Sequence, residues 1–255
     1  MMIKVIKVGG AIVEDPASLE VLLNEFVKLE GPKVLVHGGG RSATKLASQL
    51  GIQTQMVGGR RITDAEMLRI VTMVYGGSVN KNIVAALQAR GLNALGLTGA
   101  DMNLIRAHRR PITPEGIDFG FVGDIDGADG KMLVGLIEMG ITPVIAPLAH
   151  DGEGHLLNVN ADTIAQTVAT ALAPLTDVEL TYCFELPGVM QNPEDAASLI
   201  PNINGETYRQ LLEKGIISGG MIPKMDNAFK AIHEGVSKVI ITQASNLTGG
   251  TTITE

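Results

Sequence analysis

The sequence predicts an α/β protein built around a mainly parallel sheet. Apolar runs of strand length alternate with longer segments of helical period along the 255 residues, which is the pattern of βαβ units. Glycines directly follow the first two expected strands, and 45% of the residues are hydrophobic, enough to bury a sizeable core. These three observations indicate one large α/β domain or two smaller ones.

The first βαβ unit is the clearest part of this pattern. A strand is expected over residues 3–8. Asp15 and the proline after it are typical of a helix cap and first turn, so a helix should cover 16–29. The next strand is expected over 33–37. The glycine pair within 57–60 indicates a tight hairpin turn.

The remaining elements follow from the same periodicities. A long helix is expected over 64–90, with its pattern interrupted at Gly76 and Gly77. The other strands are predicted at 93–97, 105–110, 117–122, 142–146, 178–184 and 238–242. The other helices are predicted at 131–139, 162–173, 204–214 and 221–233. A boundary at 173–176 would separate residues 1–175 from 176–255, although a break within one sheet would have the same signature.

Composition excludes several classes of function. The net charge is −7, and no dense Lys/Arg cluster offers a surface for nucleic acid. The first residues lack a signal peptide, and no apolar run is long enough to span a membrane, so a cytoplasmic location is expected. Cys183 is the only cysteine and is expected to be a buried hydrophobe rather than a catalytic group. The histidines lack ligand spacing, so no metal held by the protein is predicted.

Glycines at the ends of the first two strands point to a ligand. In parallel sheets, ligands bind beyond the carboxyl ends of the strands, so Gly9, Gly10 and the run VHGGGRS should face one crevice. Glycine lets a backbone approach a ligand closely. The run matches the dinucleotide pattern G-x-G-x-x-A, but it follows the wrong strand and lacks the acidic partner. A Rossmann site is therefore excluded. A P-loop is excluded as well, because G-x-x-x-x-G-K-[ST] does not occur in the sequence.

Two lysines and an alternating polar segment accompany these glycines. Lys7 precedes the first glycine pair, and Lys224 follows a second one in SGGMIPK. In LLNVNAD, Asn158, Asn160 and Asp162 alternate with apolar residues. A helix cap would explain one of the three polar residues. The other two remain candidates for binding a ligand.

Seven segments occur in the order and spacing of the amino-acid kinase superfamily. They are IKVGGA, VHGGGRSAT, GGRRIT, SVNK, ITPVIAP, NVNAD and GIISGGMIPKMD. Together they span nearly the whole chain and most closely resemble the N-acetylglutamate kinases. The resemblance implies a three-layer αβα sandwich with a mainly parallel sheet of about eight strands. It also implies an N-terminal lobe for the acyl-glutamate and dimerisation (1–175), a C-terminal lobe for ATP (176–255), and a homodimer.

The implied reaction uses Mg²⁺ and ATP to phosphorylate the γ-carboxylate of N-acetyl-L-glutamate, the second step of arginine biosynthesis. That carboxylate is ionised at neutral pH, so no general base is needed. The barrier is repulsion between negative charges, which fixed cations and N–H groups offset. This chemistry assigns Lys7 and Lys224 to the transferring phosphoryl group. By resemblance, Asp162 orients both lysines.

The resemblance also assigns the binding residues. Arg61 matches the family's substrate arginine, whose planar donors suit a carboxylate. The other expected substrate-binding residues are Gly39, Gly40, Asn158 and Asn160. The residues expected to bind the nucleotide are Gly9, Gly10, Glu185, Gly188, Ile217 and Ser218.

One segment departs from the family pattern, and two alternatives stay open. Where the family has Thr/Ser-Asp-Val-x-Gly, this chain has Phe184-Glu185-Leu186-Pro187-Gly188, so nucleotide affinity or base preference can differ. The alternatives are a kinase for another N-acyl acceptor, such as N-succinylglutamate, and a non-catalytic regulatory binder. Arginine-inhibited members have an additional helix before the first strand, which is not seen here, so an arginine-insensitive dimer is expected.

Overall fold

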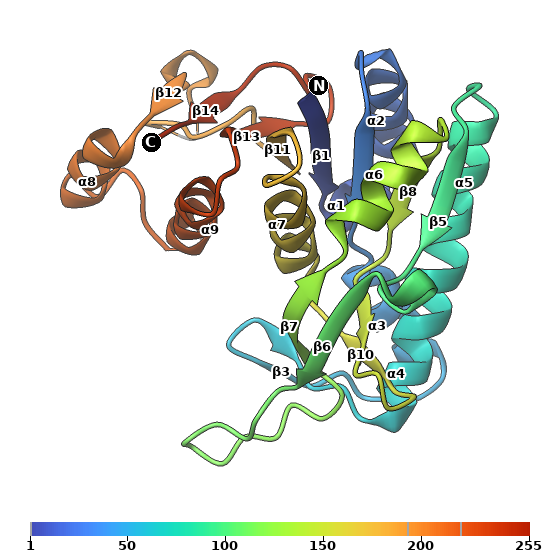
Figure 1. Cartoon of the computed structure of the whole chain (residues 1–255). Coiled ribbons are helices and arrows are strands. Elements are labelled where there is room, and N and C mark those ends of the chain that lie inside the picture. Colours follow the sequence, from blue (N-terminus) through green and yellow to red (C-terminus); the bar gives the residue numbers. More distant parts are fainter. Residues whose placement is uncertain (1, 193, 220) are drawn as a thin grey trace.

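Helices cover both faces of a large central sheet (Figure 1). The computed structural model describes residues 2–192, 194–219 and 221–255. Gly220, the second glycine of the SGGMIPK segment, lies outside the described residues. The sheet comprises β1 (Met2–Val8), β2 (Lys33–His37), β5 (Ala94–Leu97), β8 (Thr142–Ile145), β11 (Asp177–Phe184), β12 (Asn202–Ile203), β13 (Lys238–Gln243) and β14 (Thr251–Ile253).

The order of these strands is β12-β14-β13-β11-β1-β2-β8-β5. All neighbours are parallel except β13 and β14. Every residue of β2 is buried, as expected for a central strand of a sheet that is covered on both faces. The predicted α/β class, with a mainly parallel sheet of eight strands, is confirmed.

The helices are short to medium in length and alternate with the strands. They are α1 (Gly10–Glu14), α2 (Pro16–Lys28), α3 (Gly40–Gln49), α4 (Ala65–Val71), the π-helix η1 (Thr72–Val79), α5 (Asn80–Gln88), α6 (Gly130–Glu138), α7 (Ala161–Leu172), α8 (Gly205–Glu213) and α9 (Met221–His233). Two 3₁₀ turns are η2 (Asp101–Asn103) and η3 (Ala196–Ser198). The Asp15 carboxylate accepts a hydrogen bond from the N–H of Ser18 at 2.8 Å, which confirms the predicted cap of α2.

Side chains alternate between the two faces of the sheet and so divide the core. Ile3 and Val5 of β1 pack with α6, α7, α8 and α9 on one face. Ile6 and Val8 pack with α2 and α5 on the other. This alternation follows from the two-residue period of a strand. The three-layer αβα sandwich implied by the resemblance is therefore present.

Two smaller sheets extend below the main sheet in the view of Figure 1. The four-stranded one has the order β10 (Leu156–Asn158), β9 (Leu148–His150), β6 (Ile105–Arg109) and β7 (Gly123–Ala128). The other is the hairpin of β3 (Met56–Val57) and β4 (Arg60–Arg61), in which Gly58 and Gly59 have φ of 54° and 77°. The predicted hairpin is confirmed, because such angles favour glycine.

Two expectations about local structure are wrong. The strand expected at 117–122 is absent, and this segment forms only isolated bridges, Gly120 with Thr63 and Val122 with Asn158, because the pairing with β6 is made by β7 at Gly123–Ala128. The expected interruption at Gly76 and Gly77 is absent, because the helix passes through both glycines as η1. The helix α3 was not expected, since its N-cap is Gly39, which has no capping side chain.

Cys183 lies on β11 and is fully buried. Burial raises the pKa of its thiol to about 12, so the thiol stays protonated at neutral pH. The predicted role as a buried hydrophobe is confirmed.

Candidate active site

The two glycine loops meet beyond the carboxyl ends of β1 and β2. The N–H of Gly38 donates to the carbonyl of Val8 at 3.0 Å. A Cβ added to Gly38 would lie 3.0 Å from the nitrogen of Gly10, and one added to Gly10 would lie 3.5 Å from the nitrogen of Gly39. The predicted convergence of the two loops is confirmed, and their closeness leaves little room for a side chain at Gly38, whereas a Cβ on Gly10 would make an ordinary contact.

A buried histidine and asparagine hold the second loop. Nδ2 of Asn80 lies 3.1 Å from Nε2 of His37, and Nδ1 of His37 lies 2.8 Å from the carbonyl oxygen of Gly38. An amide nitrogen only donates, so Nε2 accepts and Nδ1–H donates to Gly38. Burial lowers the pKa of His37 to about 4. His37 is therefore neutral at pH 7 and anchors the glycine run.

Lys7 and Asp162 form an ion pair at the end of β1. Their side chains, Nζ to Oδ1, are 2.8 Å apart, with 8% and 27% of each side chain exposed. Asp162 lies in the first turn of α7, where the helix dipole also favours a negative charge. The structure thus brings together two of the three predicted catalytic residues.

Lys224, the third predicted catalytic residue, lies beside the ring of Phe184. Its Nζ is 3.7 Å from the ring centroid, and the Nζ of Lys7 is 5.2 Å from the same centroid. Burial lowers the pKa of Lys224, Lys7 lowers it further, and Asp162 and Glu185 raise it. Phe184 and Glu185 are the positions at which the chain departs from the family pattern, so the departure falls directly on the predicted catalytic lysines.

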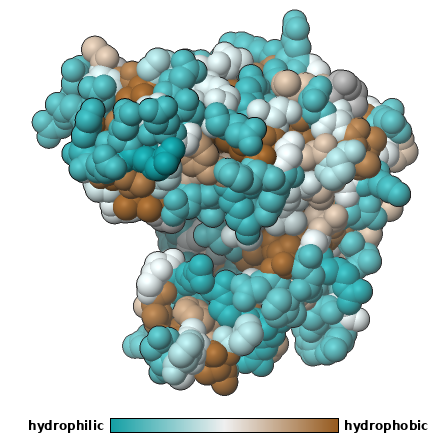
Figure 2. All heavy atoms as spheres, turned by 60° about the vertical axis from the view of Figure 1, so that its left-hand side comes forward, coloured by the Kyte–Doolittle hydropathy of each residue, from teal (hydrophilic) through white to brown (hydrophobic). Residues whose placement is uncertain are grey.

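Two adjoining cavities open at these residues. The first has a volume of about 710 Å³ and is lined by Gly9, Gly10, Phe184, Glu185 and Gly188, among others. The second has a volume of about 640 Å³ and is lined by Gly39, Asn158, Asn160, Asp162 and Tyr75, among others. Both are lined by Gly40, Met56, Arg61 and Lys224. The space-filling view shows the molecule hollowed between an upper and a lower part (Figure 2).

Arg61 is held rigidly between the cavities. Its Nη2 donates to the carbonyl of Gly40 and to Oγ1 of Thr44, both at 2.8 Å, and its Nη1 donates to Oγ1 of Thr54 at 3.2 Å. Nη1 also lies 3.9 Å from Sδ of Met67, so both Nη groups are held by protein atoms and the guanidinium plane is fixed. Nε–H is the donor that remains, and the charge of the fixed guanidinium can attract an anion.

The two asparagines predicted to bind substrate differ in their contacts. Nδ2 of Asn158 donates to Oγ1 of Thr63 at 2.9 Å, and the residue is 8% exposed. Asn160 caps α7, with Oδ1 accepting from the N–H of Asp162 at 2.7 Å. Both line the second cavity, but the capping interpretation of Asn160 is the one that the contacts support.

Two predicted nucleotide-binding residues lie apart from these cavities. Ile217 is 2% exposed and belongs to the core. Ser218 follows it in an exposed turn. The described residues that line the two cavities include neither of them.

Tyr75 lines the second cavity and has no signal in the sequence. A Cβ on Gly39 would be 2.9 Å from Cδ1 of Tyr75, so the ring packs on the glycine run. Burial raises the pKa of Tyr75 and outweighs Arg61, which lowers it. The phenol therefore remains a hydrogen-bond donor at neutral pH.

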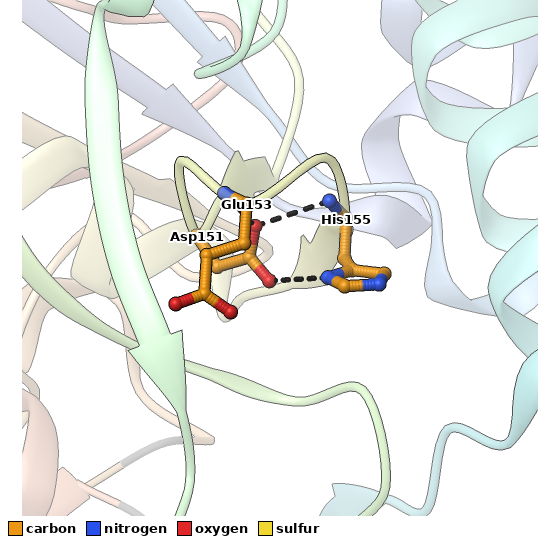
Figure 3. A group of neighbouring side chains, drawn as sticks. All are labelled: Asp151, Glu153 and His155. Atoms are coloured by element: carbon orange, nitrogen blue, oxygen red, sulfur yellow. Dashed lines mark hydrogen bonds and ion pairs between the residues drawn. The ribbon is translucent and has the colours of Figure 1, made fainter.

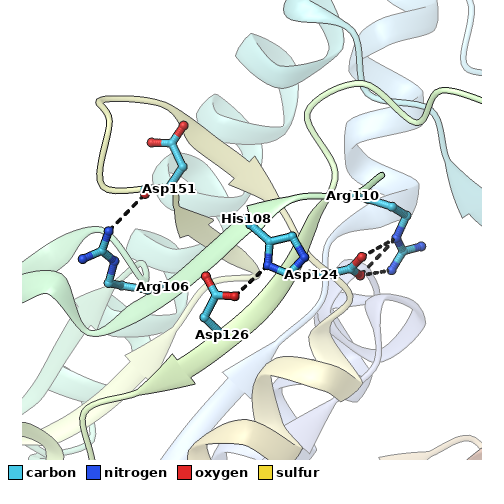
Figure 4. A network of polar contacts seen from close by, with 6 residues as sticks. All are labelled: Arg106, His108, Arg110, Asp124, Asp126 and Asp151. Carbon is cyan, nitrogen blue, oxygen red and sulfur yellow. Dashed lines mark hydrogen bonds and ion pairs between the residues drawn. The ribbon is translucent and has the colours of Figure 1, made fainter. Parts of the chain in front are cut away.

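Arg110 is a second cavity residue that the sequence analysis missed. It forms a short ion pair with Asp124, and its Nε lies 3.0 Å from Oδ1 of that residue. The pair ends a row of charged side chains along β6 and β7 that includes His108 and Asp126 (Figure 4). Among the described residues, Nη1 of Arg110 is buried without a hydrogen-bond partner. This nitrogen faces protein atoms rather than the cavity, which other atoms of Arg110 line.

One group of side chains outside the cavities has ligand types suited to a metal. Asp151, Glu153 and His155 lie on the turn between β9 and β10, with candidate ligand atoms within 4.8 Å of one another (Figure 3). Desolvation raises the pKa of Asp151, but hydrogen bonds from the N–H groups of Glu153 and His155 and from the His155 ring bring it to about 2. These hydrogen bonds stabilise the turn, and the turn explains why the three side chains lie close together.

Known proteins resemble this chain along nearly its whole length. The amino acid kinase family matches residues 2–243. The chain belongs to the amino acid kinase family. Within this family, it is 60% identical over 251 residues to the acetylglutamate kinase of Bacteroides fragilis, covering 98% of this chain and 95% of that protein. It is 55% identical over 243 residues to the acetylglutamate kinase of Cytophaga hutchinsonii, covering 95% and 92%.

A solved structure gives the same assignment of the fold. The crystal structure of smu.665 from Streptococcus mutans UA159 superposes with a TM-score of 0.77 and 27% identity, covering 99% of this chain and 98% of that one. None of the helices in the described part of the chain is long and apolar enough to cross a membrane.

Proposed function

We propose that the protein phosphorylates the γ-carboxylate of N-acetyl-L-glutamate with ATP, the second step of arginine biosynthesis. The observation that carries this proposal is the junction of two cavities at Lys224, beside the Lys7–Asp162 ion pair. It is found in a chain that is 60% identical to an acetylglutamate kinase. One cavity can receive the phosphate donor and the other the acyl-glutamate.

The proposed mechanism is mainly electrostatic. The acceptor carboxylate is already ionised, so no side chain has to remove a proton. Two negative charges ~4 Å apart repel by about 4 kcal/mol at an effective dielectric of 20. Lys7 and Lys224 would offset this repulsion as charge develops, and Asp162 would keep Lys7 in place.

The substrates would lie on either side of Lys224. We assign the nucleotide to the first cavity, with its phosphates against the loop at Gly9 and Gly10. We assign the acyl-glutamate to the second cavity, with Arg61 binding its free carboxylate. Residues 1–175 would then form the acceptor lobe and 176–255 the nucleotide lobe.

Magnesium would accompany the nucleotide. Asp162 faces both lysines and is engaged by Lys7. Mg²⁺ usually keeps several waters and is held by substrate phosphates with one or two carboxylates. The residues therefore fit a magnesium ion that is held by ATP, where it would neutralise phosphate charge.

ADP release by the purified protein with Mg-ATP tests the proposal. The acceptors to compare are N-acetylglutamate, N-succinylglutamate, free glutamate and N-acetylaspartate. Turnover with N-acetylglutamate alone supports the proposal. Nucleotide binding with no turnover of any acceptor would instead favour a regulatory binder on the same fold.

A second candidate acceptor is N-succinylglutamate. The observation that favours it is Arg110, which is a second arginine, besides Arg61, at the wall of the acceptor cavity. An acid-tipped acyl group needs one cation more than an acetyl group does. Preference for the succinyl compound in the same assay, lost in Arg110→Gln, would establish this alternative.

We also propose a cytoplasmic homodimer. The main sheet ends at β5, whose outer edge pairs with no other strand in the described part of the chain, and Leu95 on it is 37% exposed. The unpaired N–H and C=O groups of an open sheet edge can pair with another chain. Light scattering of the purified protein measures the assembly, and a monomeric mass would exclude the dimer.

A further inference from the structure

Phe184 ends β11 at the wall of the first cavity, beside two lysines. The ammonium groups of Lys224 and Lys7 lie 3.7 Å and 5.2 Å from the centroid of its ring. The ring also stacks on Tyr182, with centroids 6.2 Å apart and planes at 16°. Tyr182 is 2% exposed. The core therefore restricts where the ring can lie.

Lys224 has few groups to stabilise its charge. Among the described residues, no carboxylate lies within ion-pair distance of its Nζ, whereas Lys7 is paired with Asp162. The groups that face Lys224 are Lys7 on β1, Asp162 on α7 and Glu185 after β11. The face of an aromatic ring is electron-rich and attracts an ammonium group, more strongly where water is excluded. The ring is thus the nearest group that favours the charged lysine.

We propose that Phe184 is a positioning residue: its ring seats the ammonium group of Lys224 at the junction of the cavities and favours the charged form. The ring occupies one side of the ammonium group. The other side keeps N–H donors that can meet phosphate oxygens. The hydroxyl that the family usually has at this position has no such face. The inference rests on the proposed kinase function, since it concerns how Lys224 is prepared for a phosphate.

Graded fluorination of the ring tests this proposal. Phenylalanine carrying one, two or three fluorine atoms is placed at position 184 of the full chain. Fluorine withdraws electron density from the ring face and changes its volume little. The pKa of Lys224 is followed by NMR of labelled lysine side chains, identified with Lys224→Arg. The same proteins are assayed for turnover against pH.

The expected result is a stepwise fall in the pKa of Lys224 as fluorines are added. The loss of turnover at alkaline pH should shift to lower pH in parallel, because the lysine loses its proton earlier. Phe184→Leu should lower kcat/KM for ATP about tenfold, and Phe184→Tyr should retain most of it. The same fluorination at Phe26, whose ring lies 5.5 Å from Lys33 on another part of the protein, should change none of these readouts.

A titration of Lys224 that is unchanged across the fluorinated series would overturn the proposal, even if Phe184→Leu loses activity, because packing alone would then explain that loss. The NMR titration needs no turnover. A wild-type protein that phosphorylates no acceptor while Lys224 still responds to fluorination would count against the proposed function and leave this inference standing.

Discussion

Nζ of Lys7 and Oδ1 of Asp162 lie 2.8 Å apart, joining the end of the first strand to the first turn of α7. Asp162→Asn should leave Lys7 charged with little exposure to water. Removing one partner of such a pair typically costs about 3–5 kcal/mol when both are fully buried. Because Asp162 is 27% exposed, we expect about 2 kcal/mol in urea unfolding.

The same variant should lower turnover about 100-fold, since Lys7 would no longer be held at the phosphoryl position. Asp126→Asn is the matched control, because Asp126 pairs with His108 on an exposed strand, where the two side chains are 51% and 57% exposed. Equal losses in the two variants would contradict a special role for the Lys7–Asp162 pair.

Lys224→Ala separates a kinase from a binder. Removing a cation that stabilises the transferring phosphoryl group should lower kcat by a factor of about 10³. Lys230→Ala, on the same helix and with its side chain 64% exposed, should retain full turnover. Steady-state kinetics measure both. A Lys224→Ala protein with near-normal turnover would remove this lysine from the mechanism.

Arg61→Lys should weaken acceptor binding and leave the nucleotide unaffected. Lysine keeps the charge but cannot hold the carbonyl of Gly40 and two threonine hydroxyls at once, as the planar guanidinium does, so its charge would not be fixed in position. We expect the KM for the acyl-glutamate to rise by a factor of about 10–100, with a smaller change in kcat. Arg69→Lys, an exposed residue of α4, serves as the control. A KM that rises only for ATP would place Arg61 in the nucleotide site instead.

Gly39→Ala should disturb the acceptor cavity through Tyr75. The new Cβ would lie 2.9 Å from Cδ1 of the Tyr75 ring, so the ring has to shift, and overpacking typically costs about 1–3 kcal/mol. Thermal unfolding and the KM of the acceptor should both report the change. Gly77→Ala, with no atom within 4 Å of the added Cβ, should be neutral or stabilising by up to about 1 kcal/mol. If Tyr75 is the cause, Tyr75→Ala combined with Gly39→Ala should be less harmful than the sum of the two.

Stability should fall with acidity because of His37. Burial lowers its pKa from 6.5 to about 4 in the folded protein. Between these values the unfolded chain takes up a proton that the folded chain does not, so the free energy of unfolding falls as pH drops from 6.5 to 4. The decrease in the free energy of unfolding that is due to His37 should approach about 3 kcal/mol and should not grow further below the folded-state pKa.

Urea unfolding between pH 4 and pH 7 measures this dependence. His37→Gln, which keeps a donor and an acceptor, should flatten the slope in that window, and His233→Gln on the exposed end of α9 should not. An unchanged slope in His37→Gln would assign the pH dependence to other groups.

Local features of the sequence were sufficient to predict most of the fold. The residue period predicts the central strands and six of the helices. The cap at Asp15 marks the start of α2, and the glycine pair at Gly58 and Gly59, which has positive φ, predicts the hairpin. Short strands such as β12 and β14 were missed, because they contain two and three residues and show no period. The helix α3 was missed because it begins in a glycine run without a capping side chain.

In the candidate site, too, some features could be predicted from the sequence and others could not. The sequence by itself determined the two glycine loops and the lysines and carboxylate beside them, because glycine, lysine and aspartate at strand ends have a limited set of uses. Only the tertiary structure decided that Tyr75 packs on Gly39, that Arg110 pairs with Asp124 and that Phe184 lies beside both Lys7 and Lys224. These contacts join residues far apart along the chain, and their energy depends on distance and burial in space, which no local pattern records.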